Sequence, residues 1–264
     1  MNRLRVTPAT LAKRLFFRRA LGSTSALLLA GCDRIVQSES FTKVLSTGEA
    51  LSQGVRDAVG RGRLTMAQEF TKAELSPSFR GNGNTDPGGQ DYKALVAKGF
   101  ADWHLVVDGL VATPTKLSLD QLRAMPSRTQ ITRHDCVEGW SAIGQWTGVQ
   151  LGKVLELVKP QPAARFVILH CADTFADGDK QVPYYESIDL QDAYHPQTLL
   201  AYGLNDQALP ITNGAPLRLR VERQLGYKHA KYVMRLELAA DFRHVGQGNG
   251  GYWEDQGYQW YAGI

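Results

Sequence analysis

Short strand signals and helix signals follow one another in an irregular order after about residue 100. Two segments carry helix signals: 118–125, which Ser118 and Gln121 can open as a capping box, and 151–158. Stretches rich in β-branched and aromatic residues predict strands at 103–111, 129–134, 165–170, 217–221 and 232–238. A doubly wound sheet would need a regular strand–helix–strand alternation, which this order lacks. The sequence therefore favours a mixed α+β fold in a single domain over 65–264.

The first 32 residues have the layout of an export signal. Basic residues crowd 3–19, and an apolar run follows over 21–31. That run is too short to span roughly 30 Å of hydrocarbon at about 1.5 Å per residue. A buried amphipathic helix is the alternative, which the wholly basic flank disfavours. The run ends in Leu29-Ala30-Gly31-Cys32, which resembles the lipobox of bacterial lipoproteins and predicts lipidation of Cys32.

The export route has two readings. Residues 17–21, Phe-Arg-Arg-Ala-Leu, resemble a twin-arginine signal, whereas a chance arginine pair would leave the general route. Twin-arginine export carries folded proteins and would suit a cofactor inserted in the cytoplasm. Two or more acyl chains hold a protein stably on a membrane. We therefore expect residues 1–32 to be the signal, 33–64 to be a tether and N-terminal extension, and the protein to be anchored by lipid on the periplasmic side.

The net charge of +4 belongs to this signal. Six of the 30 Lys and Arg residues lie within the first 32 residues, where there is no Asp or Glu. From residue 33 onward, 24 basic residues face 26 acidic ones, which gives a charge of −2. Proteins that bind nucleic acid need a basic face, so this distribution argues against a DNA or RNA partner.

The three cysteines allow different roles. If Cys32 carries lipid, a disulfide between Cys136 and Cys171 is one possibility in an oxidising compartment. The context of Cys136 favours another, because it follows an apolar strand and is flanked by Arg133 and His134. Nearby cations favour an ionised thiolate, which binds soft metals. Two residues earlier on the strand, His134 should face the same side, either as part of a catalytic site or as a structural histidine.

The region around Cys136 resembles the molybdenum-cofactor domain of the sulfite oxidase superfamily, and most closely the bacterial periplasmic group that includes the methionine-sulfoxide reductase catalytic subunit. Four blocks in matching order carry the resemblance: 134–141 (HDCVEGWS), 146–151 (WTGVQL), 213–220 (NGAPLRLR) and 225–231 (LGYKHAK). The resemblance covers roughly 75–240. It implies a single mixed α/β molybdopterin-binding domain of the sulfite oxidase type.

The same resemblance assigns roles to individual residues. It implies a Mo-molybdopterin cofactor with Cys136 as the single protein ligand to molybdenum. It implies that Asn82 binds the cofactor, with Asn84 as the alternative, and Cys171 falls where the reductase has a cofactor-contacting Thr. Later contacts are implied at Asn213, Arg218, Lys228, His229, Ala230 and Lys231. Arg and Lys suit the cofactor phosphate, whereas a solvated edge strand is the alternative for these basic residues.

Two features depart from the family pattern, and the role of a third segment, the tail, stays open. Sulfite oxidases follow the ligand Cys with a basic run, whereas Val137, Glu138 and Trp140 follow Cys136, so a sulfite substrate is disfavoured. About 25 residues follow Leu238, against the roughly 100 of an immunoglobulin-like sandwich, so we expect no such dimerisation domain and a monomeric catalytic subunit. The tail 246–261, rich in Gly and aromatic residues, either covers the metal funnel or packs on the surface.

The sequence therefore predicts a molybdenum-dependent oxidoreductase that moves an oxygen atom to or from a small substrate, closer to a sulfoxide reductase than to a sulfite oxidase. It has no Cys-x-x-Cys-His haem motif and no iron–sulfur spacing. Electrons would then be exchanged with a separate partner, such as a membrane cytochrome b. The alternative is a cofactor-free lipoprotein that keeps the fold as a binding or assembly module. The direction of oxygen transfer stays open.

Overall fold

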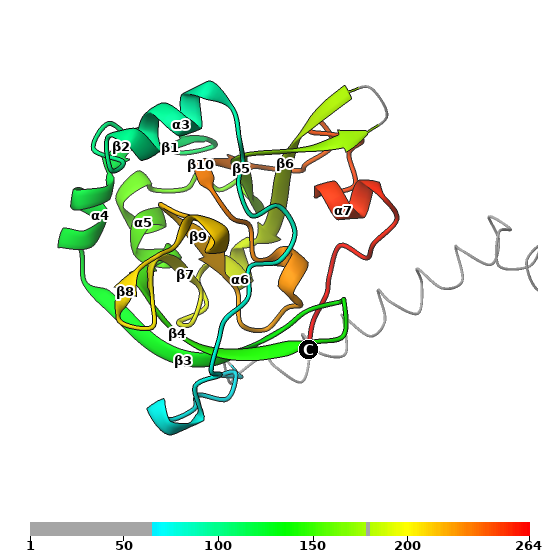
Figure 1. Ribbon diagram of the computed structural model, residues 1–264. Coiled ribbons are helices and arrows are strands. Elements are labelled where there is room, and N and C mark those ends of the chain that lie inside the picture. Colours follow the sequence, from blue (N-terminus) through cyan, green and yellow to red (C-terminus); the bar gives the residue numbers. More distant parts are fainter. Residues whose placement is uncertain (1–64, 178–179) are drawn as a thin grey trace, which may run out of the picture. The chain divides into compact units, whose positions relative to one another are not determined.

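The computed structural model describes residues 65–177 and 180–264 (Figure 1). The expected signal 1–32, the expected lipidation site Cys32 and the expected tether 33–64 lie outside these residues. The described chain forms one compact unit, Met66–Ile264. In this unit no helix has both the length and the apolar character needed to cross a membrane.

The first sheet has the last strand of the chain at its centre. Its order is β2-β1-β10-β5-β6, with β1 and β10 parallel and the other pairs antiparallel. The strands are β1 (His104–Gly109), β2 (Thr115–Ser118), β5 (Phe166–Asp177), β6 (Lys180–Asp189) and β10 (Val233–Ala239). The pairing of β5 with β6 shifts register between His170 and Thr174, so β5 bulges in its middle.

The second sheet is built on a long hairpin. Its order is β3-β4-β7-β8, and β9 also pairs with β7. The strands are β3 (Ser127–Asp135), β4 (Ser141–Gln150), β7 (Leu199–Leu204), β8 (Gln207–Ala208) and β9 (Arg218–Arg220). In the hairpin Asp135 lies opposite Ser141, so residues 136–140 form the turn between β3 and β4.

Short helices connect the strands. The α-helices are α3 (Gln90–Ala97), α4 (Leu119–Ala124), α5 (Leu151–Val158), α6 (Leu190–Ala193) and α7 (Tyr252–Asp255), and the 3-10 turns are η1 (Lys72–Glu74), η2 (Ile211–Asn213) and η3 (Gly226–Lys228). The predicted capping box is confirmed, because the Gln121 backbone N–H donates to Ser118 Oγ at 3.1 Å and the Ser118 N–H donates to Gln121 Oε1 at 2.8 Å. The predicted helix over 151–158 has the bounds of α5.

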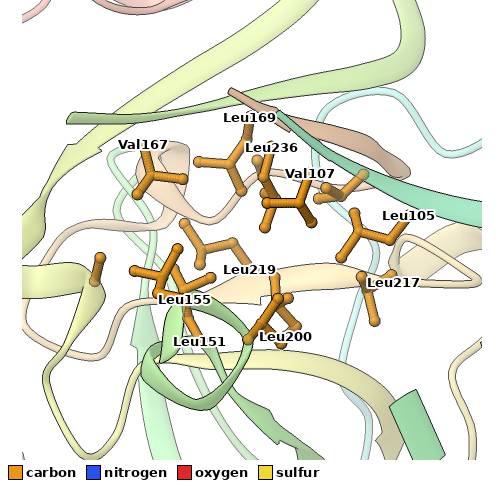
Figure 2. Close-up of a cluster of buried hydrophobic side chains, with 14 of the residues drawn as sticks. Leu105, Val107, Leu151, Leu155, Val167, Leu169, Leu200, Leu217, Leu219 and Leu236 are labelled. Atoms are coloured by element: carbon orange, nitrogen blue, oxygen red, sulfur yellow. The ribbon is translucent and has the colours of Figure 1, made fainter. Parts of the chain in front are cut away.

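The hydrophobic core joins both sheets through α5 (Figure 2). Its buried side chains come from α5, from three strands of the first sheet and from β7 and β9 of the second: Leu105, Val107, Leu151, Leu155, Val167, Leu169, Leu200, Leu219 and Leu236. Full burial of such a side chain contributes roughly 1.5–3 kcal/mol. The two sheets are therefore a rigid scaffold for the loops that extend from their ends. This arrangement confirms the expected mixed α/β single domain.

Candidate active site

A pocket with about 630 Å³ of space between its walls, part of it open to solvent, brings together distant segments. The walls come from the loop ahead of α3, the turn after β3, the strands β5 and β6, the segment around η3 and the C-terminal tail. Of the residues considered from sequence, it is lined by Asn82, Asn84, Cys136, His229 and Lys231. Several other lining residues were not predicted from the sequence: Asp173, Phe175, Tyr184 and Tyr227.

Cys136 begins the turn between β3 and β4. Its N–H donates to the Trp140 carbonyl at 2.9 Å, and its own carbonyl accepts from the Gly139 N–H at 2.9 Å. Gly139 has φ +85°, a conformation that glycine adopts without strain. This turn places the Cys136 side chain, 8% exposed, in the pocket wall. The thiol is free, and so is that of Cys171, so the disulfide alternative is wrong.

The surroundings of Cys136 do not lower the pKa of its thiol, in contrast to the expectation from the sequence. Burial raises the pKa of Cys136, and the charge of Glu138 adds to this effect, whereas Arg80 opposes it. The guanidinium of Arg133 is instead engaged by Asp135, with Nε 2.9 Å from the carboxylate. Formation of a thiolate at this position therefore needs a further positive group, such as a metal ion.

Charges of both signs lie at the mouth near Cys136. The indole N–H of Trp140 donates to Glu138 Oε2 at 2.9 Å, and the Arg80 guanidinium lies 5.0 Å from the Trp140 ring centroid. Arg80 is exposed and sits in a run of loop residues, so no sequence signal marked it. The wall after Cys136 is therefore not purely acidic and aromatic, since Arg80 partly balances Glu138.

The loop before α3 is fastened to the pocket by Lys231. The ammonium of Lys231 donates to the carbonyls of Asn82 (2.7 Å), Thr212 (3.3 Å) and Asn84. The Asn84 side chain is used within the protein, because its Nδ2 donates to the Thr174 carbonyl at 3.4 Å and its Oδ1 accepts from the Asp86 N–H at 3.2 Å. The Asn82 Oδ1 is buried without a partner. Of the two asparagines, Asn82 is thus the one with an acceptor available to a ligand.

The two histidines near the site occupy different positions. His229 lines the pocket, and its Nε2 lies 3.0 Å from the Gln224 carbonyl, so Nε2 carries the proton and Nδ1 is an acceptor without a partner. Burial, reinforced by the charge of Arg220, holds the pKa of His229 well below its usual range. The ring is therefore neutral, and it offers the pocket an acceptor.

His134 does not line the pocket, which corrects its expected place beside Cys136. It is 1% exposed, and its Nδ1 accepts from Arg220 at 2.9 Å. Its Nε2 lies behind Gly226, where an added Cβ would come within 2.5 Å. Strand alternation failed as a guide because Cys136 lies beyond the end of β3, in the turn. His134 can position the wall but cannot touch a ligand in the pocket.

Other predicted contacts lie behind the wall. Arg218, 1% exposed, donates to the carbonyls of Asn213 (3.0 Å) and His229 (3.3 Å). Its Nε has no partner, and among the described residues no carboxylate forms an ion pair with it. Asn213 is buried and donates weakly to the Phe79 carbonyl at 3.4 Å. Ala230 belongs to the hydrophobic core, and Cys171 packs against that core rather than lining the pocket.

Lys228 is committed to an internal cluster, in contrast to its expected phosphate contact. Its Nζ lies 2.5 Å from Glu186 Oε1 and 2.5 Å from Glu254 Oε1, and all three side chains are buried. Two carboxylates therefore already neutralise this ammonium. This pairing has no local signal in the sequence, because Glu186 and Glu254 come from distant elements.

The C-terminal tail covers the pocket, which decides between the two readings of 246–261. Trp253 of α7 and Tyr258 line the pocket wall. Glu254 fastens α7 through Lys228, and Asp255 Oδ2 accepts from the Tyr185 hydroxyl at 2.8 Å. The tail is thus a fixed part of the site in the described structure.

The wall fits a ligand that is both polar and charged. Three residues that line the pocket have a buried atom without a partner, namely Asn82 Oδ1, Asp173 Oδ1 and His229 Nδ1, and Arg218 Nε behind the wall is a fourth such atom. Buried polar atoms are normally hydrogen-bonded, so such a concentration indicates partners supplied by a ligand. Gly214 leaves room beside Lys231, since a Cβ there would lie 2.9 Å from Lys231 Cβ. One thiol, a set of acceptors and an uncompensated guanidinium suit a metal cofactor with a polar organic part.

These features define the class: a mixed α+β domain with a pocket for a metal-bearing organic cofactor. The chain matches the oxidoreductase molybdopterin binding domain over residues 93–244, and it belongs to this family, the sulfite oxidase family. It is accordingly an oxidoreductase with a Mo-molybdopterin cofactor.

Several relatives are similar over most of the chain. A protein of Azospira oryzae provisionally named as the protein-methionine-sulfoxide reductase subunit YedZ1 is 35% identical over 96% of this chain and 88% of its own length. The protein-methionine-sulfoxide reductase catalytic subunit MsrP of Xanthomonas axonopodis pv. citri is 35% identical over 83% of this chain and 67% of its own. The crystal structure of the sulfane dehydrogenase SoxCD from Paracoccus pantotrophus is 21% identical, with a TM-score of 0.47 over 53% of this chain and 39% of that one.

Proposed function

We propose that this protein reduces sulfoxides with its molybdenum cofactor, transferring the oxygen atom away from sulfur. The observation that carries the proposal is the free thiol of Cys136 in a pocket where three buried acceptor atoms, Asn82 Oδ1, Asp173 Oδ1 and His229 Nδ1, lack partners. The names of the relatives, which are methionine-sulfoxide reductase subunits, support the same substrate class.

The residues present would hold the cofactor in distinct ways. Cys136 would ligate the molybdenum through its sulfur, and Asn82 and His229 would accept hydrogen bonds from the organic part. Lys231 in the wall and Arg218 behind it make this side of the pocket positive, which suits a phosphate. When bound, the cofactor supplies two-electron redox chemistry and an acceptor for the oxygen atom.

The pocket surface suits the organic part of a sulfoxide. Phe175, Tyr227, Trp253 and Tyr258 give it an aromatic lining, and Val137 at the mouth is 49% exposed. Apolar groups next to sulfur gain from contact with such a surface. Reduction of a sulfoxide consumes two electrons and two protons, and it gives a thioether and water. A sulfite dianion would be repelled by Glu138, although Arg80 offsets part of that charge.

The proposal extends to the partner and the cellular location. A membrane cytochrome of the b type would supply the electrons, since the sequence carries no haem or iron–sulfur motif. Export by the twin-arginine signal and lipidation of Cys32 would hold the protein as a monomeric catalytic subunit on the periplasmic side. Residues 1–32 would then be the signal and 33–64 the tether.

Metal and pterin analysis tests the proposal directly. The full chain, expressed with its own N-terminus in a host that makes the cofactor, should contain close to one molybdenum and one pterin per protein. Cys136→Ser should lose the molybdenum and the charge-transfer absorption of the metal–thiolate bond, whereas Cys171→Ser should retain both. A wild-type protein without molybdenum and pterin would contradict the proposal and favour the cofactor-free module. Assays with sulfoxides, N-oxides and sulfite would then rank the substrates.

A further inference from the structure

Three side chains behind the pocket form a buried cluster with more carboxyls than cations. Lys228 of η3 and Glu186 of β6 are fully buried, and Glu254 of α7 is 4% exposed. Both carboxyls contact the same ammonium, through Glu186 Oε1 and Glu254 Oε1. One ammonium balances one carboxylate, so two ionised carboxylates would leave an uncompensated negative charge in the interior, which is costly. The cluster is therefore neutral only while one of the two carboxyls keeps a proton.

The second oxygens of these carboxyls also call for a proton. Oε2 of Glu186 and Oε2 of Glu254 are buried, and neither has a hydrogen-bond partner. Native proteins rarely leave buried acceptors without a donor. A protonated carboxyl has an O–H group that can donate, whereas a carboxylate can only accept. A proton on one of these oxygens therefore supplies the donor that the cluster lacks.

Glu186 is the carboxyl that keeps this proton. Burial and the charge of Glu254 raise the pKa of Glu186 well above its ordinary value of 4.5, although Lys228 opposes this effect. The other titratable groups that interact with Glu186 lie on its own strand and on β5: Tyr184, Tyr185 and Cys171. Burial raises the pKa of each of these three groups, and all three are uncharged when protonated. None of them therefore compensates a second carboxylate.

The main chain of the C-terminal tail covers the cluster directly. An added Cβ at Gly251 would overlap Glu254 Oε2 and would lie 2.7 Å from Glu186 Oε1, so the backbone ahead of α7 lies against both carboxyls. Glycines also flank α7, with φ +102° at Gly250 and φ +97° at Gly257, and glycine changes its backbone conformation at little cost. Movement of α7 away from β6 would bring Glu186 into contact with water.

We propose that Glu186, Lys228 and Glu254 form a proton-controlled latch for α7. While Glu186 holds its proton, Lys228 pairs with Glu254 and keeps α7 on the pocket, with Trp253 and Tyr258 in the wall. Loss of the proton places two carboxylates on one ammonium, and α7 then moves out so that water solvates the extra charge. The latch contains no residue of the pocket lining, so it does not depend on the proposed function.

Opening of α7 should increase with pH. A group whose pKa is raised in the folded state stabilises that state fully below its ordinary pKa, and this stabilisation is lost as the pH rises through the raised value. For Glu186 the loss begins near pH 4.5. Because opening of α7 is coupled to the release of one proton, the open fraction should increase by up to about tenfold for each pH unit in this range.

Amide hydrogen exchange of the full chain, followed by mass spectrometry from about pH 5 to about pH 9, tests the latch. At each pH the exchange rate of residues 250–258 in wild type is divided by the rate in Glu186→Gln. This ratio cancels the intrinsic pH dependence of exchange and the titration of Asp255, which also fastens α7. The ratio should rise by up to about tenfold per pH unit, because glutamine has no proton to release.

Two further variants complete the comparison. The ratio of wild type to Glu254→Gln should rise in the same way, because a single carboxylate then faces Lys228 and no stored proton is needed. The matched control is Glu156→Gln, at an exposed glutamate of α5, and it should follow wild type at every pH.

Three results would overturn the latch. A ratio that stays constant with pH would show that opening of α7 is not coupled to Glu186. A rise for Glu186→Gln but not for Glu254→Gln would show that the two carboxyls do not compete for one ammonium. Exchange of residues 250–258 no faster than that of β4 in wild type would show that α7 opens only when the whole domain unfolds.

Discussion

Lys228 and Glu254 lie 2.5 Å apart, Nζ to Oε1, with both side chains buried. Glu186 contacts the same ammonium at 2.5 Å. One residue after Lys228 comes His229, which lines the pocket, and one residue before Glu254 comes Trp253, which also lines it. This ion pair therefore joins two walls of the active site.

Removal of the Lys228 ammonium should strongly lower the free energy of unfolding. Lys228→Met leaves two carboxylates buried without a cation, which costs roughly 3–5 kcal/mol in comparable cases. Urea unfolding of the cofactor-free protein measures the change. Glu254→Gln, which keeps the lysine paired with Glu186, should cost less. Equal stability of Lys228→Met and wild type would contradict the assigned pairing.

Loss of the Trp253 side chain should weaken substrate binding more than it slows the chemical step. Trp253→Ala opens the aromatic wall, so KM for an apolar sulfoxide should rise several-fold while molybdenum content stays constant. The reason is that an aromatic contact contributes roughly 0.5–1.5 kcal/mol beyond its buried area. Steady-state kinetics with a sulfoxide and an artificial electron donor provide the measurement. A fall in kcat with unchanged KM would assign Trp253 to another role.

The effects of substitutions at Gly226 and His134 on the free energy of unfolding should be strongly coupled. A Cβ at Gly226 would lie 2.5 Å from His134 Nε2 and 3.3 Å from the Asp135 carbonyl. Gly226→Ala should therefore destabilise the protein by about 1–3 kcal/mol through overpacking. In the double variant with His134→Ala most of that cost should disappear, because the ring no longer occupies the space. Additive effects in this double-mutant cycle would refute the contact.

Asp173 should give the cofactor-free protein a defined pH dependence. Burial raises the pKa of Asp173 to about 7, from an ordinary value of 3.8. The folded state then holds the proton more tightly, so this stabilisation is complete below about pH 4 and is lost as the pH rises to about 7. The unfolding free energy of wild type minus that of Asp173→Asn should fall over this range. A flat difference would show that the carboxyl is not desolvated.

The local sequence predicted local structure well. The helix α5 and the capping box of Ser118 depend on residues only a few positions apart, so the sequence pattern alone predicts them. β4 was missed because Gly144 and Gly148 weaken a strand pattern. Gly148 is required there by packing, since a Cβ would lie 2.3 Å from the Leu200 carbonyl of β7. Only the fold reveals that requirement.

The site was predictable only in part. The motif around Cys136 identified the pocket, yet strand alternation misplaced His134, because Cys136 lies in a turn. Lys228 was expected to bind the cofactor, but it forms ion pairs with two carboxylates from distant parts of the chain. Asp173 reaches the pocket through a bulge, and a bulge has no clear signal in a single sequence. Trp253 and Tyr258 reach it through a tail whose path depends on buried contacts made far along the chain.

The pocket can bind the cofactor only after all the segments that form its walls have been synthesised. Lys231 fastens the loop of Asn82, and Tyr258 lines the same pocket from the C-terminal tail. A nascent polypeptide that has not yet exposed residue 258 has the first of these segments but not the last. The complete binding site exists only after residues 82 to 258 have all been synthesised and folded, so the cofactor binds to a chain in which this whole region is already formed.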